Sequence, residues 1–182
     1  MRTAHALRTA ITVGATLALA TACGVEFGER ADSTSTTPTL AMDHLLNPCT
    51  DIPDEWLIET GLDPSSEPDS VNPAEPSAWR VCGWRSVDKP YRVDVMSSSR
   101  TFEETRANPN IVVLRETTVG SRRALVSRII SDTIEESCYV AFPAEREMFT
   151  VAVGWYATHP MIEDRCELAV KHAADLERRL PR

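Results

Sequence analysis

The sequence predicts an α+β domain in which an antiparallel sheet packs with an N-terminal and a C-terminal helix. Between residues 79 and 156, apolar and polar side chains alternate in several short segments, which is typical of half-buried strands. Near the end of the chain, six apolar residues are spaced by 4, 3, 4, 3 and 4 positions, which is the stripe of an amphipathic helix. Strands grouped between helices favour an antiparallel sheet over the alternating order of a parallel one.

Residues 1–22 have the pattern of a lipoprotein signal peptide. The chain starts with Arg2 and Arg8, carries no charge from Thr9 to Val25, and reaches small residues before a cysteine. The rival interpretation is a transmembrane helix. However, seventeen uncharged residues rise only about 26 Å as a helix, which is less than the roughly 30 Å core of a bilayer. The sequence therefore predicts an exported protein.

Cys23 is the expected lipid anchor. The run LATAC, residues 19–23, resembles the lipobox of bacterial lipoprotein precursors, in which the cysteine is joined to diacylglycerol and the chain is cut before it. Each buried lipid CH₂ contributes about 0.8 kcal/mol, so two or more acyl chains hold a protein at a membrane. The alternative is a secreted protein with a free Cys23. The lipobox favours a location on the extracytoplasmic face of the cell membrane.

The next segment, residues 23–39, is expected to be a flexible tether, because it is rich in Ser and Thr and has no apolar period. Residues 40–182 are enough for a single domain with its own core. Removing Arg2 and Arg8 leaves 17 Lys and Arg against 27 Asp and Glu, which is a net charge of −10. Such acidity argues against a nucleic-acid partner.

The first element of the domain is expected to be a helix within residues 49–64, CTDIPDEWLIETGLDP. Asp51 is a candidate cap, Pro53 suits the first turn, and Gly61 is a stop signal. Ile52 and Trp56 are four positions apart and would share the face that covers the sheet. The Pro-rich residues 64–78 that follow are expected to be an exposed loop.

Six segments then have strand patterns, and one segment has the pattern of a short helix. The expected strands lie within residues 80–86, 91–95, 111–120, 123–130, 136–143 and 147–156. The short helix is expected within residues 99–110 and ends before Pro109. The final helix carries the stripe Ile162, Cys166, Ala169, Ala173, Leu176 and Leu180.

With Cys23 used for lipid, Cys49, Cys82, Cys138 and Cys166 form an even set in an exported protein, which predicts two disulfides. Four cysteines allow three pairings. We favour Cys49–Cys82 and Cys138–Cys166, each of which closes a loop of about 30 residues and stabilises the fold by about 3 to 4 kcal/mol. A zinc site would need Cys or His pairs a few positions apart. The sequence has no such pair, so we expect no metal and no cofactor.

The order of several short motifs resembles the order of motifs in a known family. LLNPC at 45–49, CGW at 82–84, TTVGSRRALV at 117–126 and CYV at 138–140 precede a closing helix with C…A…A…L spacing. They resemble the actinobacterial lipoprotein family catalogued as domain of unknown function 3558, over residues 42–180. The resemblance implies an envelope location and fold but supplies no catalytic residues. The order of elements is also similar to the sandwich of the photosystem accessory protein PsbP, which is an analogy of fold alone.

From the sequence we expect that the protein is not an enzyme. His44, His159 and His172 remain after cleavage, and we expect each of them to be solvated. A Ser–His–acid site would need a strained serine turn, and no G-x-S-x-G motif occurs. Adjacent acidic residues such as Glu103 and Glu104 point apart and do not make an acid–base pair.

Two binding functions remain. The first, which we favour, is an accessory or scaffolding module that binds an envelope protein, and it predicts an exposed apolar or loop surface without a sizeable cavity. The second is a carrier of a small apolar or lipid ligand in a pocket between sheet and helix. Trp84, Trp155 and Tyr156, with Trp79, are the candidate pocket residues, since aromatic side chains often line such cavities. The alternative is that Trp84 and Trp155 belong to the core and that Tyr156 is half exposed.

Overall fold

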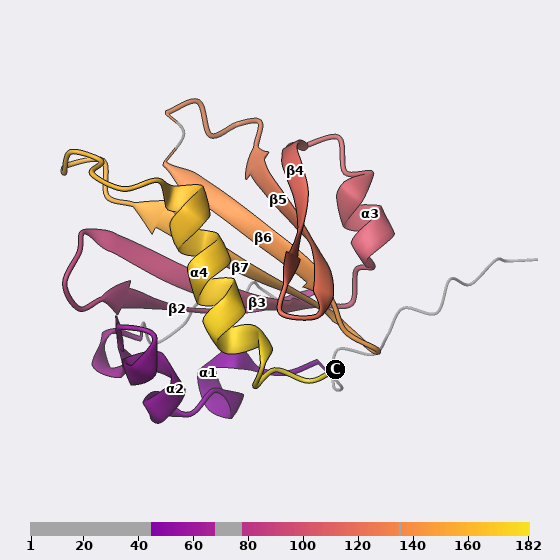
Figure 1. Ribbon diagram of the computed structural model, residues 1–182, viewed down its shortest axis with the longest axis horizontal. Coiled ribbons are helices and arrows are strands. Elements are labelled where there is room, and N and C mark those ends of the chain that lie inside the picture. Colours follow the sequence, from indigo (N-terminus) through magenta and orange to yellow (C-terminus); the bar gives the residue numbers. More distant parts are fainter. Residues whose placement is uncertain (1–44, 68–77, 135) are drawn as a thin grey trace, which may run out of the picture. The chain divides into compact units, whose positions relative to one another are not determined.

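A seven-stranded antiparallel sheet forms the centre of the fold (Figure 1). The computed structural model describes residues 45–67, 78–134 and 136–182. The sheet order is β1-β2-β3-β7-β6-β5-β4, and all neighbouring strands are antiparallel. The predicted α+β fold with an antiparallel sheet is therefore confirmed. The predicted signal peptide, Cys23, the tether and His44 lie outside the described residues, as do residues 68–77 of the Pro-rich loop.

The strands and helices have the following bounds. The strands are β1 (Leu62–Asp63), β2 (Trp79–Ser86), β3 (Tyr91–Ser98), β4 (Ile111–Val119), β5 (Arg122–Ile129), β6 (Ser137–Pro143) and β7 (Met148–Trp155). The helices are α1 (Pro48–Asp51), α2 (Asp54–Glu59), α3 (Phe102–Arg106) and α4 (Arg165–Glu177), with a 3₁₀ turn η2 (Pro64–Ser66).

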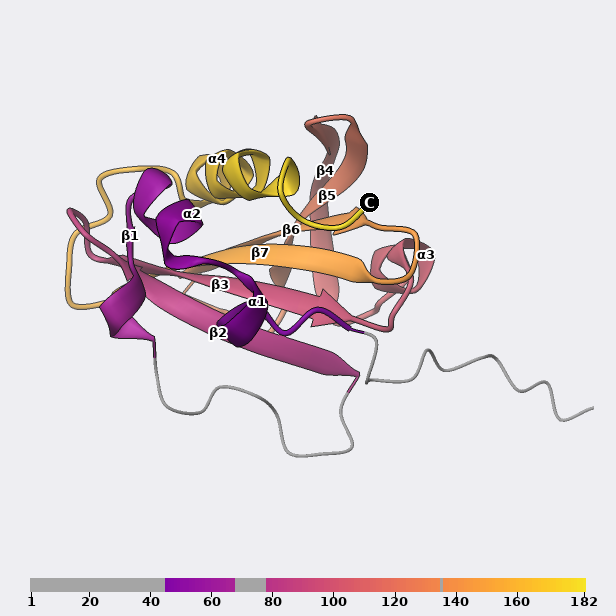
Figure 2. The ribbon, with the colours of Figure 1, turned by 90° about the horizontal axis from the view of Figure 1, so that it is seen from below.

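The helices are distributed unequally over the two faces of the sheet. Helix α4 packs on β6 and β7, and α1 packs on β2; Figure 2 shows α2 and α4 on the same side of the sheet. We call this side the covered face. Two disulfides tie its helices to strands, Cys49–Cys82 for α1 and Cys138–Cys166 for α4. The opposite side, which we call the open face, carries the short helix α3, whose Phe102 packs against Leu125 and Ala141.

The main core lies on the covered face. Its strand residues include Val93, Val95, Val140, Phe142, Phe149, Val151 and Val153, and α4 adds Leu168, Ala169, Ala173 and Leu176. These residues follow the period of two along the strands and the helical stripe along α4. Burying each Val, Leu or Phe side chain contributes about 1.5 to 3 kcal/mol, so this layer is the main source of stability.

The predicted helix within residues 49–64 is two short helices in the structure. Helix α1 begins after Asn47, whose Oδ1 accepts a hydrogen bond from the Cys49 N–H at 3.2 Å. The chain is extended at Ile52, because the residue before Pro53 avoids the helical region. Helix α2 then starts after Pro53, and Gly61 follows it with a φ of 83°, as a helix stop requires.

Helix α4 begins three residues later than the predicted stripe. The Asp164 carboxylate accepts hydrogen bonds from the N–H groups of Cys166 at 2.7 Å and Glu167 at 3.0 Å, which fixes the first turn. Ile162 precedes this cap and is 69% exposed, so it does not belong to the stripe. Leu180 follows the helix but is buried against the same core.

A buried ion pair fixes the end of α4 to the β4–β5 turn. Arg122 Nε lies 2.8 Å from Glu177 Oε1, although its N–H is not aligned for a hydrogen bond. The Arg122 guanidinium also donates to the carbonyl of Leu180 at 3.0 Å, near the end of the helix. Gly120 forms the turn with a φ of 57°, and a Cβ at this position would overlap the Glu177 carboxylate. Only glycine fits both the backbone and the space here.

Candidate functional site

The structure places two of the predicted pocket residues in the core. Trp84 is 1% exposed and Trp155 is 3% exposed, both on the covered face. The Trp155 ring stacks on Tyr91 with centroids 5.9 Å apart. Tyr156 is half-buried at the end of β7. The tryptophans Trp84 and Trp155 therefore fill the space between the sheet and its helices.

An apolar pocket of about 280 Å³ lies instead on the open face, between the sheet and the end of α3. Its strand residues are Trp79, Val81, Met96, Ile111, Ser127, Ile129, Tyr139, Ala141 and Thr150, and Thr105, Asn108 and Asn110 close one end. We call it the apolar pocket. Trp79 is thus the one predicted aromatic residue that lines an apolar cavity.

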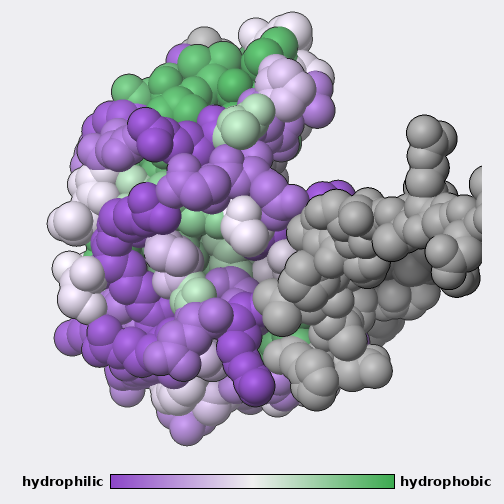
Figure 3. Space-filling view, turned by 90° about the vertical axis from the view of Figure 1, so that its right-hand side faces the viewer, coloured by the Kyte–Doolittle hydropathy of each residue, from purple (hydrophilic) through white to green (hydrophobic). Residues whose placement is uncertain are grey.

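The register of the strands explains why this pocket is hollow. Val81 lies opposite Met96, Met96 opposite Thr150, and Thr150 opposite Ala141, so one row of open-face side chains crosses four strands. The short side chains Ser127, Ala141 and Thr150 stand at the centre of the sheet. Bulkier residues, Trp79 and Met96 on one side and Ile129 on the other, form the walls. Figure 3 shows a hollow between polar ridges on the side of the molecule that carries α3 and β4.

Apolar residues also gather at one end of the outer strand β4. Val112, Val113, Leu114, Ile130 and Ile134 are between 38% and 69% exposed. We call this set the β4 patch, and it forms the apolar area at the top of Figure 3. Strand β4 is the edge of the sheet and pairs with β5 alone among the described strands. Its pairing is interrupted between Val113 and Arg115, which is a common way to protect an edge.

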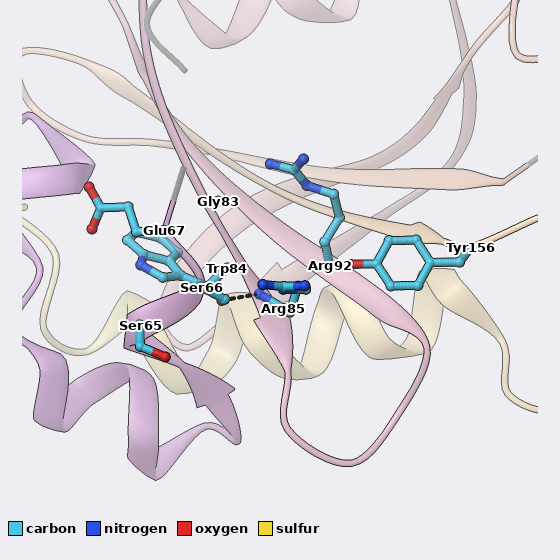
Figure 4. A pocket seen from close by; sticks show the side chains of 8 residues that line it. All are labelled: Ser65, Ser66, Glu67, Gly83, Trp84, Arg85, Arg92 and Tyr156. Atoms are coloured by element: carbon cyan, nitrogen blue, oxygen red, sulfur yellow. Dashed lines mark hydrogen bonds between the residues drawn. The ribbon is translucent and has the colours of Figure 1, made fainter. Parts of the chain in front are cut away.

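A second, polar pocket of about 360 Å³ lies farther along β2 and β3 (Figure 4). Its lining is Ser65, Ser66, Glu67, Gly83, Trp84, Arg85, Arg92 and Tyr156. Trp84 and Tyr156, predicted to line an apolar cavity, therefore border a polar one.

The charged groups of the polar pocket are arranged around Gly83. Arg92 donates from Nε to Asp94 Oδ1 at 2.9 Å and also from a terminal nitrogen. A Cβ at Gly83 would overlap both of these side chains, so the glycine makes room for the ion pair. Burial raises the pKa of the Asp94 carboxyl, although the Arg92 charge opposes this shift. Arg85 is exposed, and no acidic side chain of the described residues forms an ion pair with it.

His172 is buried, so the prediction that it is solvated was wrong. It is 1% exposed, on the face of α4 that meets α2 and β3. Thr60 donates its hydroxyl proton to Asp175 Oδ2 at 2.7 Å and must therefore accept from His172 Nδ1 at 2.8 Å. His172 Nε2 then accepts from the Tyr91 hydroxyl at 3.0 Å, which assigns the neutral Nδ1–H tautomer.

The pKa of His172 is lowered to about 4, chiefly by burial and in part by the nearby Lys171 charge. The imidazole is sealed by its partners and lines neither of the two pockets. Its role is to connect α4 with α2 and β3. His159, by contrast, is exposed in the turn after β7, as predicted.

One cluster of metal-ligating residue types lies at the Cys49–Cys82 disulfide. A Glu67 oxygen and the sulfur atoms of Cys49 and Cys82 lie within 4.8 Å of one another. The two sulfurs are bonded to each other, and a disulfide offers no thiolate for a metal. In the oxidised protein this cluster is a structural crosslink beside an exposed carboxylate.

Among residues 45–67, 78–134 and 136–182, no helix has the length and apolar character needed to cross a bilayer. Comparisons with curated proteins and with solved structures gave no match, so the analogy with PsbP stays a prediction. The lipid anchor and the actinobacterial source likewise stay predictions.

A comparison with family models matched residues 18–179 to a family described as "Protein of unknown function (DUF3558)". The matched range includes both pockets, both disulfides and the β4–β5 turn. It also includes the motif TTVGSRRALV, which contains Gly120 and Arg122 of that turn. Since the match covers most of the chain, the protein belongs to the DUF3558 family of proteins of unknown function.

Proposed function

We propose that this protein is a lipid-anchored envelope protein that binds a small apolar ligand in the apolar pocket. The observation that carries the proposal is the apolar lining on the face of the sheet that no long helix of the described residues covers. An antiparallel sheet usually has one face in the core and one polar face toward water. Here Val81, Met96 and Ile129 occupy open-face positions, and a bound ligand would remove their side chains from water.

The dimensions of the pocket suit a small ligand or a single acyl chain. Its volume of about 280 Å³ lies near the lower end of the roughly 300 to 1,000 Å³ that is usual for ligand sites. Trp79 and Tyr139 supply rings, while Ser127, Thr150 and Asn108 supply a few polar groups that would orient a ligand. This mixture is typical of sites that bind largely apolar molecules.

The proposed anchor would give this pocket access to membrane lipids. Lipid on Cys23 would hold the chain at the extracytoplasmic face of the membrane. A flexible tether of sixteen residues, 24–39, would have an average span of roughly 22 Å. The proposal is for binding and not for catalysis, because it uses no nucleophile or general base and relies on burial alone.

The proposal can be tested with N-phenyl-1-naphthylamine, a neutral apolar dye whose fluorescence rises on binding. The protein is used with Cys23→Ala and a cleavable secretory signal, so that no detergent competes for the pocket. Met96→Gln places an amide in the pocket wall at similar volume, and an unpaired amide costs about 1 to 3 kcal/mol. Affinity should fall at least about fivefold.

Met161→Gln is the matched control, since Met161 is exposed and lines neither pocket. It should leave dye binding unchanged. Equal dye affinities for the Met96 and Met161 variants would refute the site. Native mass spectrometry of protein taken from its own membrane provides the complementary measurement. A mass excess above the lipidated chain that is lost on denaturation would report the natural ligand.

The β4 patch favours a second function, the docking of an envelope protein. Exposed apolar residues at a sheet edge are typical of interaction sites. A photoreactive amino acid at Val112 should then give a discrete crosslinked species in cells. The same group at Val87, which is 64% exposed and outside the patch, is the control and should give none. Identical crosslinking patterns at both positions would exclude this function for the patch.

A further inference from the structure

We infer that the ligand of the apolar pocket is a single-chain anionic amphiphile whose head group binds between Arg85 and Arg92 in the polar pocket. This inference rests on the proposed function and adds the chemical class of the ligand. It follows from the position of the two pockets on the same face and from an unusual pairing of two arginines across β2 and β3.

The two pockets adjoin on the open face, although Trp84 of the covered face also borders the polar pocket. On β2, Val81 lines the apolar pocket and Gly83, the next residue on that face, lines the polar pocket. On β3, Met96 belongs to the apolar pocket and Arg92 to the polar one. At about 3.3 Å per residue, the four positions from Met96 to Arg92 span about 13 Å. A molecule of modest length therefore reaches from one pocket to the other.

Arg85 and Arg92 lie directly opposite each other in the β2–β3 register. Side chains in such a pair project from the same face, and like charges directly opposite are unfavourable. Asp94 compensates Arg92. On β1, Asp63 lies opposite Arg85, but its carboxylate accepts from the Ser65 N–H at 3.0 Å and forms no ion pair with Arg85. An anion bound here would supply the counter-charge that Arg85 lacks among the described residues.

The donors of the polar pocket match an anionic head group. Figure 4 shows the backbone N–H of Arg85 bonded to Ser66 and the Tyr156 hydroxyl beside the base of the Arg92 side chain, whose guanidinium extends away from it. The bonds to Asp94 use two nitrogens of Arg92 and leave further N–H groups for a ligand. Among the described residues, Glu67 is the one carboxylate in the lining and Asp94 neutralises Arg92, so Arg85 is the guanidinium that has no ion-pair partner there. Guanidinium groups bind carboxylate and phosphate oxygens in paired hydrogen bonds.

The test is isothermal titration of the same Cys23→Ala protein with three ten-carbon probes at low salt. Decanoate and decyl phosphate carry an anionic head, and 1-decanol carries a neutral one. Decanoate or decyl phosphate should bind at least about tenfold more tightly than 1-decanol, the effect of one charge-assisted hydrogen bond. The tighter of the two anions identifies the head group.

Arg85→Gln is the informative variant, because Arg85 is exposed and its loss leaves no buried charge unpaired. It should lower the affinity for the preferred anion about five- to tenfold and leave 1-decanol within twofold. Arg178→Gln removes an exposed charge that lines neither pocket and should change neither affinity.

The outcomes separate this inference from the proposed function. Equal binding of the anions and 1-decanol would overturn the head-group site and leave the apolar pocket in place. An unchanged anion preference in Arg85→Gln would also overturn the assignment to this arginine pair. Failure of all three probes and of the neutral dye would overturn the proposed function itself.

Discussion

Acid should destabilise this protein through His172. The imidazole is neutral in the folded state, where its pKa is lowered from 6.5 to about 4, chiefly by burial. Positive charges on Lys171 and Lys89 contribute to this lowering of the pKa, while Asp175 opposes it. The unfolded chain therefore binds a proton on this residue at a higher pH than the folded chain does. The neutral imidazole contributes its full stabilisation above pH 6.5, and that contribution is lost as the pH falls from 6.5 toward 4.

The magnitude follows from the shift in pKa. A shift of one unit corresponds to 1.36 kcal/mol, so a lowering from 6.5 to about 4 gives about 3 kcal/mol. This is a large share of the 5 to 15 kcal/mol by which a domain is usually stable. Below pH 4 both states are protonated at this site, and the contribution stops changing.

The assay is urea unfolding at several pH values between 7 and 4, with both disulfides intact. His172→Gln lacks the titrating group and should be less stable at pH 7 by about 1 to 3 kcal/mol, because buried partners lose a hydrogen bond. Between pH 7 and pH 4 the wild type should lose about 3 kcal/mol more than this variant. His159→Gln removes an exposed histidine and should keep the wild-type slope. Parallel pH profiles for wild type and His172→Gln would refute the linkage.

Three further predictions concern the backbone, the crosslinks and the anchor. Gly120→Ala should cost at least about 2 kcal/mol in urea unfolding, because strain at its positive φ adds to overlap with a buried carboxylate of α4. Gly61→Ala is the control, since its φ is also positive but the space is empty, and it should cost about 1 kcal/mol. Replacing both Cys138 and Cys166 with Ala should lower the free energy of unfolding by about 2 to 5 kcal/mol, whereas a loss below 1 kcal/mol would contradict a tie between α4 and the sheet. Cys23→Ala should move the protein out of the membrane fraction, and its retention there would contradict the lipid anchor.

The covered face could be predicted because its signals are local. The period of two in β6 places Cys138 inward, and the helical stripe places Cys166 on the inner side of α4, so each element indicates its own inner side. The structure joins these two cysteines. The break between α1 and α2 also had a local signal, because Pro53 disfavours helix at the residue before it.

The burial of His172 depends on distant partners. The residue adjoins Ala173 of the predicted stripe, but Thr60 and Tyr91 come from elements far away in the sequence. Nothing in the local pattern distinguishes a solvated flank of α4 from one that α2 covers. The helical stripe alone therefore could not place this side chain.

The apolar pocket also had a signal in the sequence, but the alternation of inward and outward residues along each strand obscures it. In β6 and β7, positions that a one-sided sheet would make polar are occupied by Ala141, Met148 and Ala152. Strands in which odd-numbered and even-numbered positions are both apolar are typical of sheets that are buried on two faces. The alternation in each strand indicates a single inner face, so the second apolar face was not predicted, and the pocket was expected between the sheet and a helix around Trp84, Trp155 and Tyr156.

Two adjacent residues of β3 can show that the two faces serve different purposes. Val95 points into the covered core and is fully buried, whereas Met96 lines the apolar pocket. Val95→Ala removes about two buried methyl groups and should cost about 2 kcal/mol of stability, while dye affinity stays within twofold. Met96→Gln should change stability by less than about 1 kcal/mol but weaken dye binding at least about fivefold. Urea unfolding measures the stability of each variant, and dye titration measures its affinity for the dye. If Met96→Gln were as destabilising as Val95→Ala, the open face would be a second part of the folding core, and its apolar lining would need no ligand to explain it.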